Sequence, residues 1–232
     1  MAIFLAGDTH GLLDVGKLEE FFVNEENFSK EDLLIICGDV GCCGFTAQGS
    51  ADTKRFFSDL PVTVAFVDGN HEHHPNLNDY PVDEWNGGKV HFIAEDIIHL
   101  MRGQIYEFEG MKFFTMGGAF SVDRDSRIKG ISWFPEELPS EEEYEEAWSN
   151  LEKNDYKVDY IITHTGPTDV AAELGFSSYD EAERLTNELQ RIAEEVEFSH
   201  WFFGHYHIDD DLDETYHCLL DRVIDLADFS KL

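Results

Sequence analysis

Basic residues are scarce in this chain. Its 232 residues include 16 Lys and Arg against 49 Asp and Glu, which gives a formal net charge of −33. Proteins that bind extended nucleic acid neutralise many phosphates with Lys and Arg, so this composition argues against long DNA or RNA as a partner. Because exposed charges more than about 8 Å apart are largely screened at physiological salt, a small phosphorylated substrate remains compatible with the acidic surface.

Cysteine and long apolar runs are also scarce. The four cysteines form neither a Cys-x-x-Cys pair nor a disulfide-framework spacing, which argues against a disulfide-stapled scaffold. No segment approaches the roughly 18 to 20 apolar residues that span a bilayer, and no basic region precedes the first apolar run as in a signal peptide. We therefore expect a cytoplasmic protein without a membrane partner. With 42% hydrophobic residues and no linker or repeat, residues 1–232 are expected to form a single domain.

Five short apolar runs each end at a cluster of Gly, Asp, Asn or His. The clusters are Gly7-Asp8-Thr9-His10-Gly11, Gly38-Asp39, Asp68-Gly69-Asn70-His71-Glu72, His164 and Gly204-His205-Tyr206-His207. The runs are typical of buried parallel strands, and α/β sheets place their ligand sites outside the carboxyl ends of such strands. We therefore expect the five clusters to converge on one site.

Each cluster alone has an ordinary interpretation. A capped turn or a hydrogen-bonded surface histidine is more common than a metal ligand at any one of these positions. However, five of the eleven histidines fall inside the five clusters, which makes coincidence a poor explanation for the whole set.

The ordered series Asp-x-His, Gly-Asp, Gly-Asn-His-Glu, His and Gly-His-x-His resembles the calcineurin-like metallophosphoesterase family. All five blocks are present here, in order, over most of the chain. The resemblance implies an α/β fold, the calcineurin-like four-layer sandwich, in which two mixed β-sheets pack face to face with helices on the outside. It also implies an enzyme, a metal-dependent phosphoric ester hydrolase.

Two loops indicate the branch of the family. Residues 117–127 and 133–137 resemble a bacterial and phage branch whose substrates are generally unassigned. The protein serine/threonine phosphatase branch carries an arginine shortly after the bridging Asp and another before Gly-Asn-His-Glu. Here residues 40–44 contain no arginine and Asp68 precedes Gly69, so protein phosphatase activity is not expected.

The resemblance also implies a set of metal ligands. It places Asp8, His10 and His207 on one divalent metal ion and Asn70, His164 and His205 on a second, with Asp39 bridging the two. Imidazole mixed with carboxylate and amide oxygen suits Mn²⁺, Fe or Zn²⁺ and does not suit Ca²⁺; we favour manganese. His71, next to a ligand but not itself one in the family, is the expected general acid, and Glu72 is expected to orient its neighbours.

Three side chains are candidates for binding the substrate. Arg127 and Arg124 follow a predicted strand that ends in paired glycines, and either could form bidentate bonds to phosphate. Surface ion pairs with Asp123 and Asp125 are the competing interpretation of the arginines. The third candidate is Asn70. Trp85, Trp133 and Phe134 could stack on an aromatic leaving group, although aromatic side chains more often serve packing.

The predicted function is hydrolysis of a small phosphomonoester or phosphodiester by in-line attack of a metal-bound hydroxide. Both phosphatase and phosphodiesterase activity fit this prediction, and Asp39 and His71 would be the catalytic residues. One alternative is a nuclease acting on short nucleic acid, which the net charge disfavours. The other is a catalytically idle metal-binding scaffold, which the complete ligand set disfavours. The oligomeric state stays open.

The sequence between the clusters predicts further elements. Residues 72–88 are irregular and predict a long loop, and residues 89–116 alternate in short runs that predict an antiparallel meander forming the second sheet. Ser140 followed by acidic residues predicts a helix over 141–151, and periodicity predicts the longest helix over 180–196. Residues 216–219 and 222–226 predict a hairpin-like pair.

Overall fold

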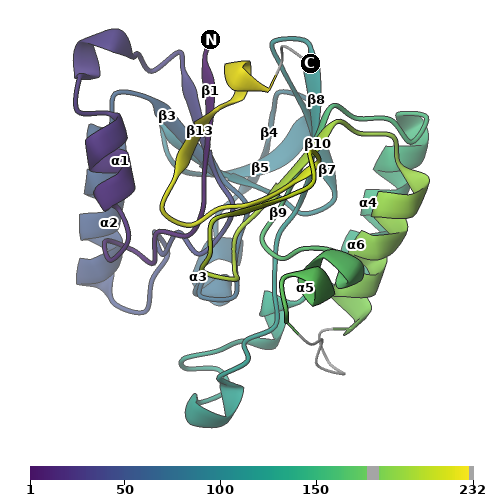
Figure 1. Cartoon of the computed structure of the whole chain (residues 1–232). Helices are drawn as coiled ribbons and strands as arrows, with labels where there is room; N and C mark the ends of the chain where they lie inside the picture. The colour runs from purple at the N-terminus through teal and green to yellow at the C-terminus, as the bar shows by residue number, and fades with distance from the viewer. Residues whose placement is uncertain (177–182, 230–232) are drawn as a thin grey trace.

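The computed structural model describes residues 1–176 and 183–229, and it has four layers (Figure 1). Two β-sheets pack face to face, and helices cover the outer face of each sheet. This arrangement confirms the predicted α/β sandwich of two mixed sheets. None of the described helices combines the length and the apolar content that a bilayer crossing requires.

The first sheet has seven strands. In spatial order they are β13 (Val223–Asp225), β1 (Ile3–Ala6), β2 (Leu33–Ile36), β3 (Thr63–Phe66), β6 (Ile97–Leu100), β5 (Gly88–Ala94) and β4 (Val82–Trp85). Strands β1, β2, β3 and β6 run parallel, and the edge strands pair antiparallel. Three of the five predicted site strands therefore lie side by side at the centre of this sheet.

The second sheet has six strands. In spatial order they are β11 (Asp210–Leu212), β12 (Tyr216–Cys218), β10 (His200–Phe203), β9 (Tyr160–Thr163), β8 (Met111–Met116) and β7 (Gln104–Phe108). Strands β8, β9, β10 and β12 run parallel. The remaining two site strands, β9 and β10, are neighbours here.

Successive side chains of a strand point to opposite faces of its sheet. One face packs against the other sheet, and the opposite face packs against helices. Leu5 of β1 and Ile35 of β2 point into the space between the sheets, where they meet residues such as Phe202 of β10. Phe4 and Leu34 point to the opposite face, where helices cover the first sheet. Strands buried on both faces explain the continuous apolar runs in the sequence.

The helices lie on the two outer faces. They are α1 (Gly16–Phe21), α2 (Ala47–Asp59), α3 (His74–Asn78), α4 (Glu141–Lys153), α5 (Thr168–Glu173) and α6 (Glu183–Glu195), with short 3₁₀ turns at Glu25–Asn27, Arg124–Ser126, Pro135–Glu137 and Leu226–Asp228. Helices α1 and α2 lie over the first sheet, and α4, α5 and α6 lie over the second (Figure 1). Helix α4 is the one predicted over 141–151; Ser140 is its N-cap, and the structure adds a complete capping box with Glu143.

Two predictions of strand pairing are wrong. The meander predicted over 89–116 is divided, because β5 and β6 join the first sheet and β7 and β8 join the second. The hairpin predicted at 216–226 is divided in the same way, since β12 pairs with β10 and β13 pairs with β1. In both places a short turn carries the chain from one sheet to the other, and alternation of apolar residues does not distinguish that turn from a hairpin.

One further segment differs from the sequence expectation. The loop predicted over 72–88 contains the short helix α3 and the edge strand β4. For helix α6, the structure describes Glu183–Glu195; the predicted start at Asp180 stays a prediction, because residues 177–182 lie outside the described residues.

Candidate metal centre

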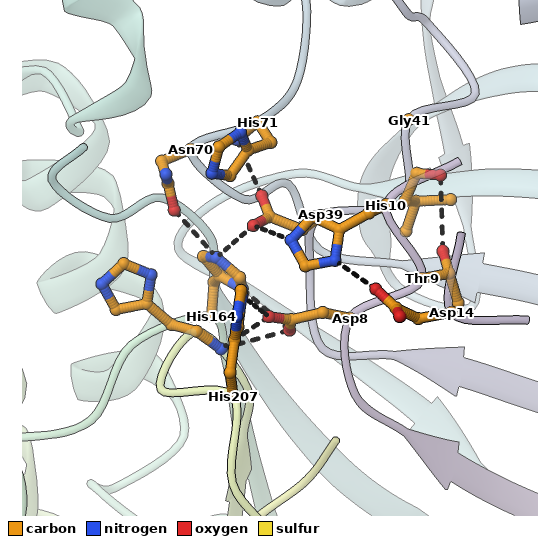
Figure 2. A network of polar contacts seen from close by, with 12 residues as sticks. Asp8, Thr9, His10, Asp14, Asp39, Gly41, Asn70, His71, His164 and His207 are labelled. Carbon is orange, nitrogen blue, oxygen red and sulfur yellow. Dashed lines mark hydrogen bonds and ion pairs between the residues drawn. The ribbon is translucent and has the colours of Figure 1, made fainter. Parts of the chain in front are cut away.

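The five predicted clusters meet at one end of the molecule. β1, β2 and β3 of the first sheet and β9 and β10 of the second all end there. Figure 2 shows Asp8, Asp39 and His164 pointing toward one another from different strands, with His10 and His207 beside them. The convergence follows from parallel pairing, which brings the carboxyl ends of adjacent strands to one edge.

Unusual backbone conformations aim several of these side chains. Positive φ angles are found at His10 (44°), Asp39 (52°), His205 (68°) and His207 (53°). Such angles are uncommon for residues other than glycine, and they concentrate where function requires a particular side-chain direction.

Two glycines make room for the carboxylates. A Cβ atom at Gly69 would lie 2.1 Å from Asp39 Oδ1, and one at Gly204 would lie 2.1 Å from Asp8 Oδ1. Any side chain at these positions would displace a predicted ligand. The sequence shows both glycines, but only the structure shows which carboxylate each one accommodates.

Asp39 occupies the centre of the site. Its Oδ2 atom lies 3.3 Å from His10 Nε2 and 3.3 Å from His164 Nε2, is buried, and has no hydrogen-bond partner among the described residues. Its Oδ1 atom accepts a hydrogen bond of 2.7 Å from the backbone N–H of His71. One carboxylate oxygen is thus held by the protein, and the other faces two imidazoles that belong to the two predicted metal positions.

Asp8 is the second buried carboxylate. It accepts bonds of 3.1 Å from the backbone N–H of His205, and its Oδ2 atom lies 3.4 Å from His207 Nε2. Burial raises the pKa of Asp8, and the nearby charge of Asp39 also raises it, against the opposing effect of His164. Two carboxylates this close together in a buried site require positive charge between or beside them.

Two histidines beside these carboxylates have raised pKa values, which favours their positively charged forms. Burial alone would lower the pKa of His164, but Asp39, Asp8 and the carbonyl of Cys37 together raise it to about 10. A similar balance raises the pKa of His10 to about 9. For Asp39, burial favours the neutral form, yet His164 and His10 hold its pKa well below the usual range. A divalent cation bound among these groups would supply the same positive charge that protons supply here.

Hydrogen bonds fix which nitrogen of each imidazole faces the centre. His10 Nδ1 lies 2.8 Å from Asp14 Oδ2, and His164 Nδ1 lies 2.7 Å from the carbonyl oxygen of Cys37. Both contacts leave Nε2 directed at Asp39, which is the arrangement in which a metal-binding histidine uses its second nitrogen for orientation. Asp14 was not predicted; its signal in the sequence is an acid four residues after His10.

Asn70 is oriented through a buried chain of polar contacts. Its Nδ2 atom donates to Ser121 Oγ at 3.1 Å, and Ser121 Oγ donates to Glu137 Oε2 at 2.8 Å. The amide oxygen of Asn70 therefore faces the centre, 3.1 Å from His164 Nε2. Ser121 and Glu137 were not predicted, since no local pattern connects them with Asn70.

The candidate ligands form three overlapping triads. In each triad the ligand atoms lie within 4.8 Å of one another, and the triads are Asp8, His10 and His207; His10, Asp39 and His71; and Asp8, Asp39 and His164. The first is the set predicted for one metal. His205 lies beside His164 with ring centroids 5.1 Å apart, and burial, followed by the charge of His164, lowers the pKa of His205 to about 3, which keeps its imidazole neutral.

The two candidate arginines have different surroundings. Arg127 Nη2 lies 2.5 Å from His71 Nδ1, and Arg127 Nε donates to Asp123 at 2.8 Å. Arg124 instead forms bonds of 2.9 Å and 2.6 Å with Oε1 of the buried Glu137. Its guanidinium also lies over the ring of Trp133. Of the two, Arg127 is therefore the one that reaches the predicted general acid.

Glu72 holds the backbone that follows Asp39. Its carboxylate accepts from the N–H of Val40 at 2.7 Å and of Gly41 at 3.1 Å. Burial, and then the charge of Asp39, raises the pKa of Glu72 to about 8. These contacts agree with the orienting role expected for Glu72.

Comparison with known proteins identifies relatives over most of the chain. A family model described as calcineurin-like phosphoesterase matches residues 1–209. A lariat debranching enzyme from Danio rerio is 22% identical over an alignment 244 residues long, gaps included. The alignment covers 90% of this chain. The chain spans only 40% of the length of that relative.

Two crystal structures share the fold. One is TT1561 from Thermus thermophilus, with a TM-score of 0.53 and 13% identity, covering 98% of this chain and 95% of that protein. The other is a protein from Staphylococcus aureus provisionally named a 5′-nucleotidase and crystallised with α-ketoglutarate. It has a TM-score of 0.51 and 14% identity, and covers 94% of this chain and 48% of that protein.

Proposed function

The chain belongs to the calcineurin-like phosphoesterase family, and on that premise we propose that it hydrolyses small phosphomonoesters or phosphodiesters with two divalent metal ions. Asp8, His10 and His207 would hold one ion, and Asn70, His164 and His205 would hold the other. Asp39 would contact both. Mn²⁺ is the ion that we favour, with Fe and Zn²⁺ as alternatives for the same donor set.

The observation that carries the proposal is the position of Asp39 Oδ2. Within the described part of the chain this buried oxygen has no hydrogen-bond partner, and it lies 3.3 Å from an imidazole nitrogen on each side. Ligand atoms around one metal ion at about 2.0 to 2.2 Å from it are separated from one another by about 3.0 to 3.5 Å. The spacing around Asp39 Oδ2 fits a ligand shared between two such ions.

When bound, a pair of such ions polarises the phosphate and lowers the pKa of coordinated water toward about 7. The protein supplies the remaining parts. The buried carboxylates Asp8 and Asp39 would hold the metal ions in place, and Glu72 stabilises the loop that follows Asp39.

His71 would donate the proton to the leaving oxygen. Burial lowers the pKa of His71, and the charge of Arg127 lowers it further, against the opposing effect of Asp39. Arg127, which contacts His71, would bind a non-bridging phosphate oxygen. Arg124 would support this loop through Glu137.

A phosphodiesterase acting on short nucleic acid is the second candidate, and the similarity to a lariat debranching enzyme favours it. The net charge of −33 opposes binding of long nucleic acid. A steep fall in substrate affinity with rising salt would favour the nuclease over an enzyme of small substrates.

Paired turnover assays test the proposal. Protein supplied with Mn²⁺ would be assayed on p-nitrophenyl phosphate and on bis(p-nitrophenyl) phosphate, with Asp39→Asn as control. We expect turnover that Asp39→Asn abolishes without unfolding the protein, and the preferred ester would distinguish monoesters from diesters. Unchanged turnover in Asp39→Asn would refute the assignment. No turnover of either ester by protein that holds two metal ions would favour the idle metal-binding scaffold.

A further inference from the structure

A cavity of about 550 Å³ opens beside the candidate metal centre. His10, Asp39 and His71 form one end of it. The remaining walls come from the turn after His10, the loop after Asp39 and the first two turns of α2. A volume of this size is in the range of small-molecule sites.

The outer walls carry exposed apolar side chains. Leu13 is 83% exposed, Phe45 is 47% exposed and Leu12 is 44% exposed, and all three line the cavity. Clustered exposed apolar groups are unfavourable in water, and next to a reactive centre they are typical of a ligand-binding surface.

The described residues that line the cavity include no Lys or Arg. Apart from the metal-centre residues, the only charged group among these lining residues is Asp52. The Asp52 carboxylate is held in place by Gln48 at 2.8 Å and Arg55 at 3.0 Å. An additional anionic group of a substrate would therefore meet a carboxylate and apolar surface.

The wall is held in place by aromatic contacts. The ring of Phe45 is stacked on that of Phe134, with centroids 6.2 Å apart and 11° between the planes. His73 packs against both rings. Thr46 caps α2 by accepting from the N–H of Gly49, so this end of the helix is also defined.

From these observations we propose that the cavity receives the leaving group of the phosphoester and selects one that is neutral and apolar or aromatic over one with a further negative charge. The inference rests on the proposed function. His71 would protonate the leaving oxygen and also lines the cavity, so the leaving group extends from that oxygen into the space bounded by Leu13 and Phe45.

Binding of phosphonates to the Mn²⁺-loaded protein tests this inference without turnover. Methylphosphonate probes the metal end alone, benzylphosphonate adds a neutral ring, and 4-carboxybenzylphosphonate adds a charge to that ring. By calorimetry we expect benzylphosphonate to bind about tenfold more tightly than either of the others.

Matched variants test whether Leu13, Phe45 and Asp52 of the cavity wall contact the ring of the ligand. Leu13→Ser and Phe45→Ala should remove most of the advantage of benzylphosphonate while leaving methylphosphonate binding unchanged. Val23→Ser, an exposed apolar residue away from the cavity, should change neither. Asp52→Lys should bring 4-carboxybenzylphosphonate to the affinity of benzylphosphonate or beyond, and Asp59→Lys, at the other end of α2, should not.

The outcomes separate this inference from the proposed function. If methylphosphonate and the other two phosphonates all fail to bind, the proposed function fails, and the inference fails with it. If methylphosphonate binds but the two benzyl compounds bind equally, or the wall variants have no effect, only the leaving-group inference is overturned.

Discussion

Asp14 accepts a hydrogen bond from the imidazole of His10, with 2.8 Å between Asp14 Oδ2 and His10 Nδ1. The other ring nitrogen of His10, Nε2, faces Asp39. A carboxylate in this position fixes the ring and raises its basicity as a ligand. Asp14→Asn should therefore weaken metal binding by about 10- to 100-fold, which is the usual effect of losing such a partner. Competition with a fluorescent chelator would measure it. Glu19→Gln, an exposed acid on α1, is the control, and equal affinities in both variants would contradict the role of Asp14.

His71→Ala should affect substrates according to their leaving groups. An alkoxide needs a proton as it departs, whereas nitrophenolate leaves readily without one. Loss of a general acid typically costs about 10²- to 10⁴-fold, so we expect a loss of that size for an alkyl phosphate and a much smaller loss for p-nitrophenyl phosphate. Steady-state kinetics on the two esters measures the difference. Equal losses would show that His71 does not act as the acid.

The two candidate arginines between β8 and α4, Arg124 and Arg127, should respond differently to mutation. Arg127→Gln should raise KM by about tenfold through loss of a charged phosphate contact, with little change in thermal stability. Arg124→Gln should mainly destabilise the protein, by about 3 to 5 kcal/mol, because it leaves the buried Glu137 carboxylate without its cation. Kinetics and thermal unfolding of both variants decide the assignment. A raised KM with unchanged stability in Arg124→Gln would make Arg124 the phosphate contact instead.

His91 should make the protein acid-sensitive. Burial, and then the neighbouring His99, lowers the pKa of His91 to about 4. Between pH 6.5 and 4 the unfolded chain binds a proton at His91 and the folded chain does not, so stability falls as the pH falls through this range. From pH 7 to pH 5 we expect His91 to contribute a loss of about 1 to 2 kcal/mol. Urea unfolding of the wild type and of His91→Gln at both pH values measures the contribution of His91 to the free energy of unfolding. An equal loss of stability in both proteins would refute this contribution.

The sequence was informative where ligands directly follow strands. Asp8, Asp39 and His164 each come shortly after an apolar run, so the end of the run predicted both the strand and the place of the side chain. The pairing of strands was less predictable. Residues 88–100 and 104–116 alternate in the same way, yet they belong to different sheets, because burial on one face leaves the same pattern in either sheet.

The supporting residues of the site were the least predictable. Ser121 and Glu137 reach Asn70 only through the folded loop, across a sequence separation of 51 residues between Asn70 and Ser121. Local sequence patterns do not predict contacts between residues so far apart in the chain. The cavity wall is similar, because Phe45 and Phe134 come together from distant loops. Phe134 is a sequence candidate for stacking on an aromatic leaving group, and in the structure its ring stacks on Phe45, a lining residue of the cavity.

We propose that Asp39 is shared by two metal ions. Anomalous diffraction at the manganese edge, from crystals grown with Mn²⁺, would locate both ions. We predict two peaks about 3.5 to 4 Å apart, both in contact with the Asp39 carboxylate, with Asp8, His10 and His207 around one and Asn70, His164 and His205 around the other. A single peak, or a second peak that does not contact Asp39, would show that Asp39 does not bridge two metal ions.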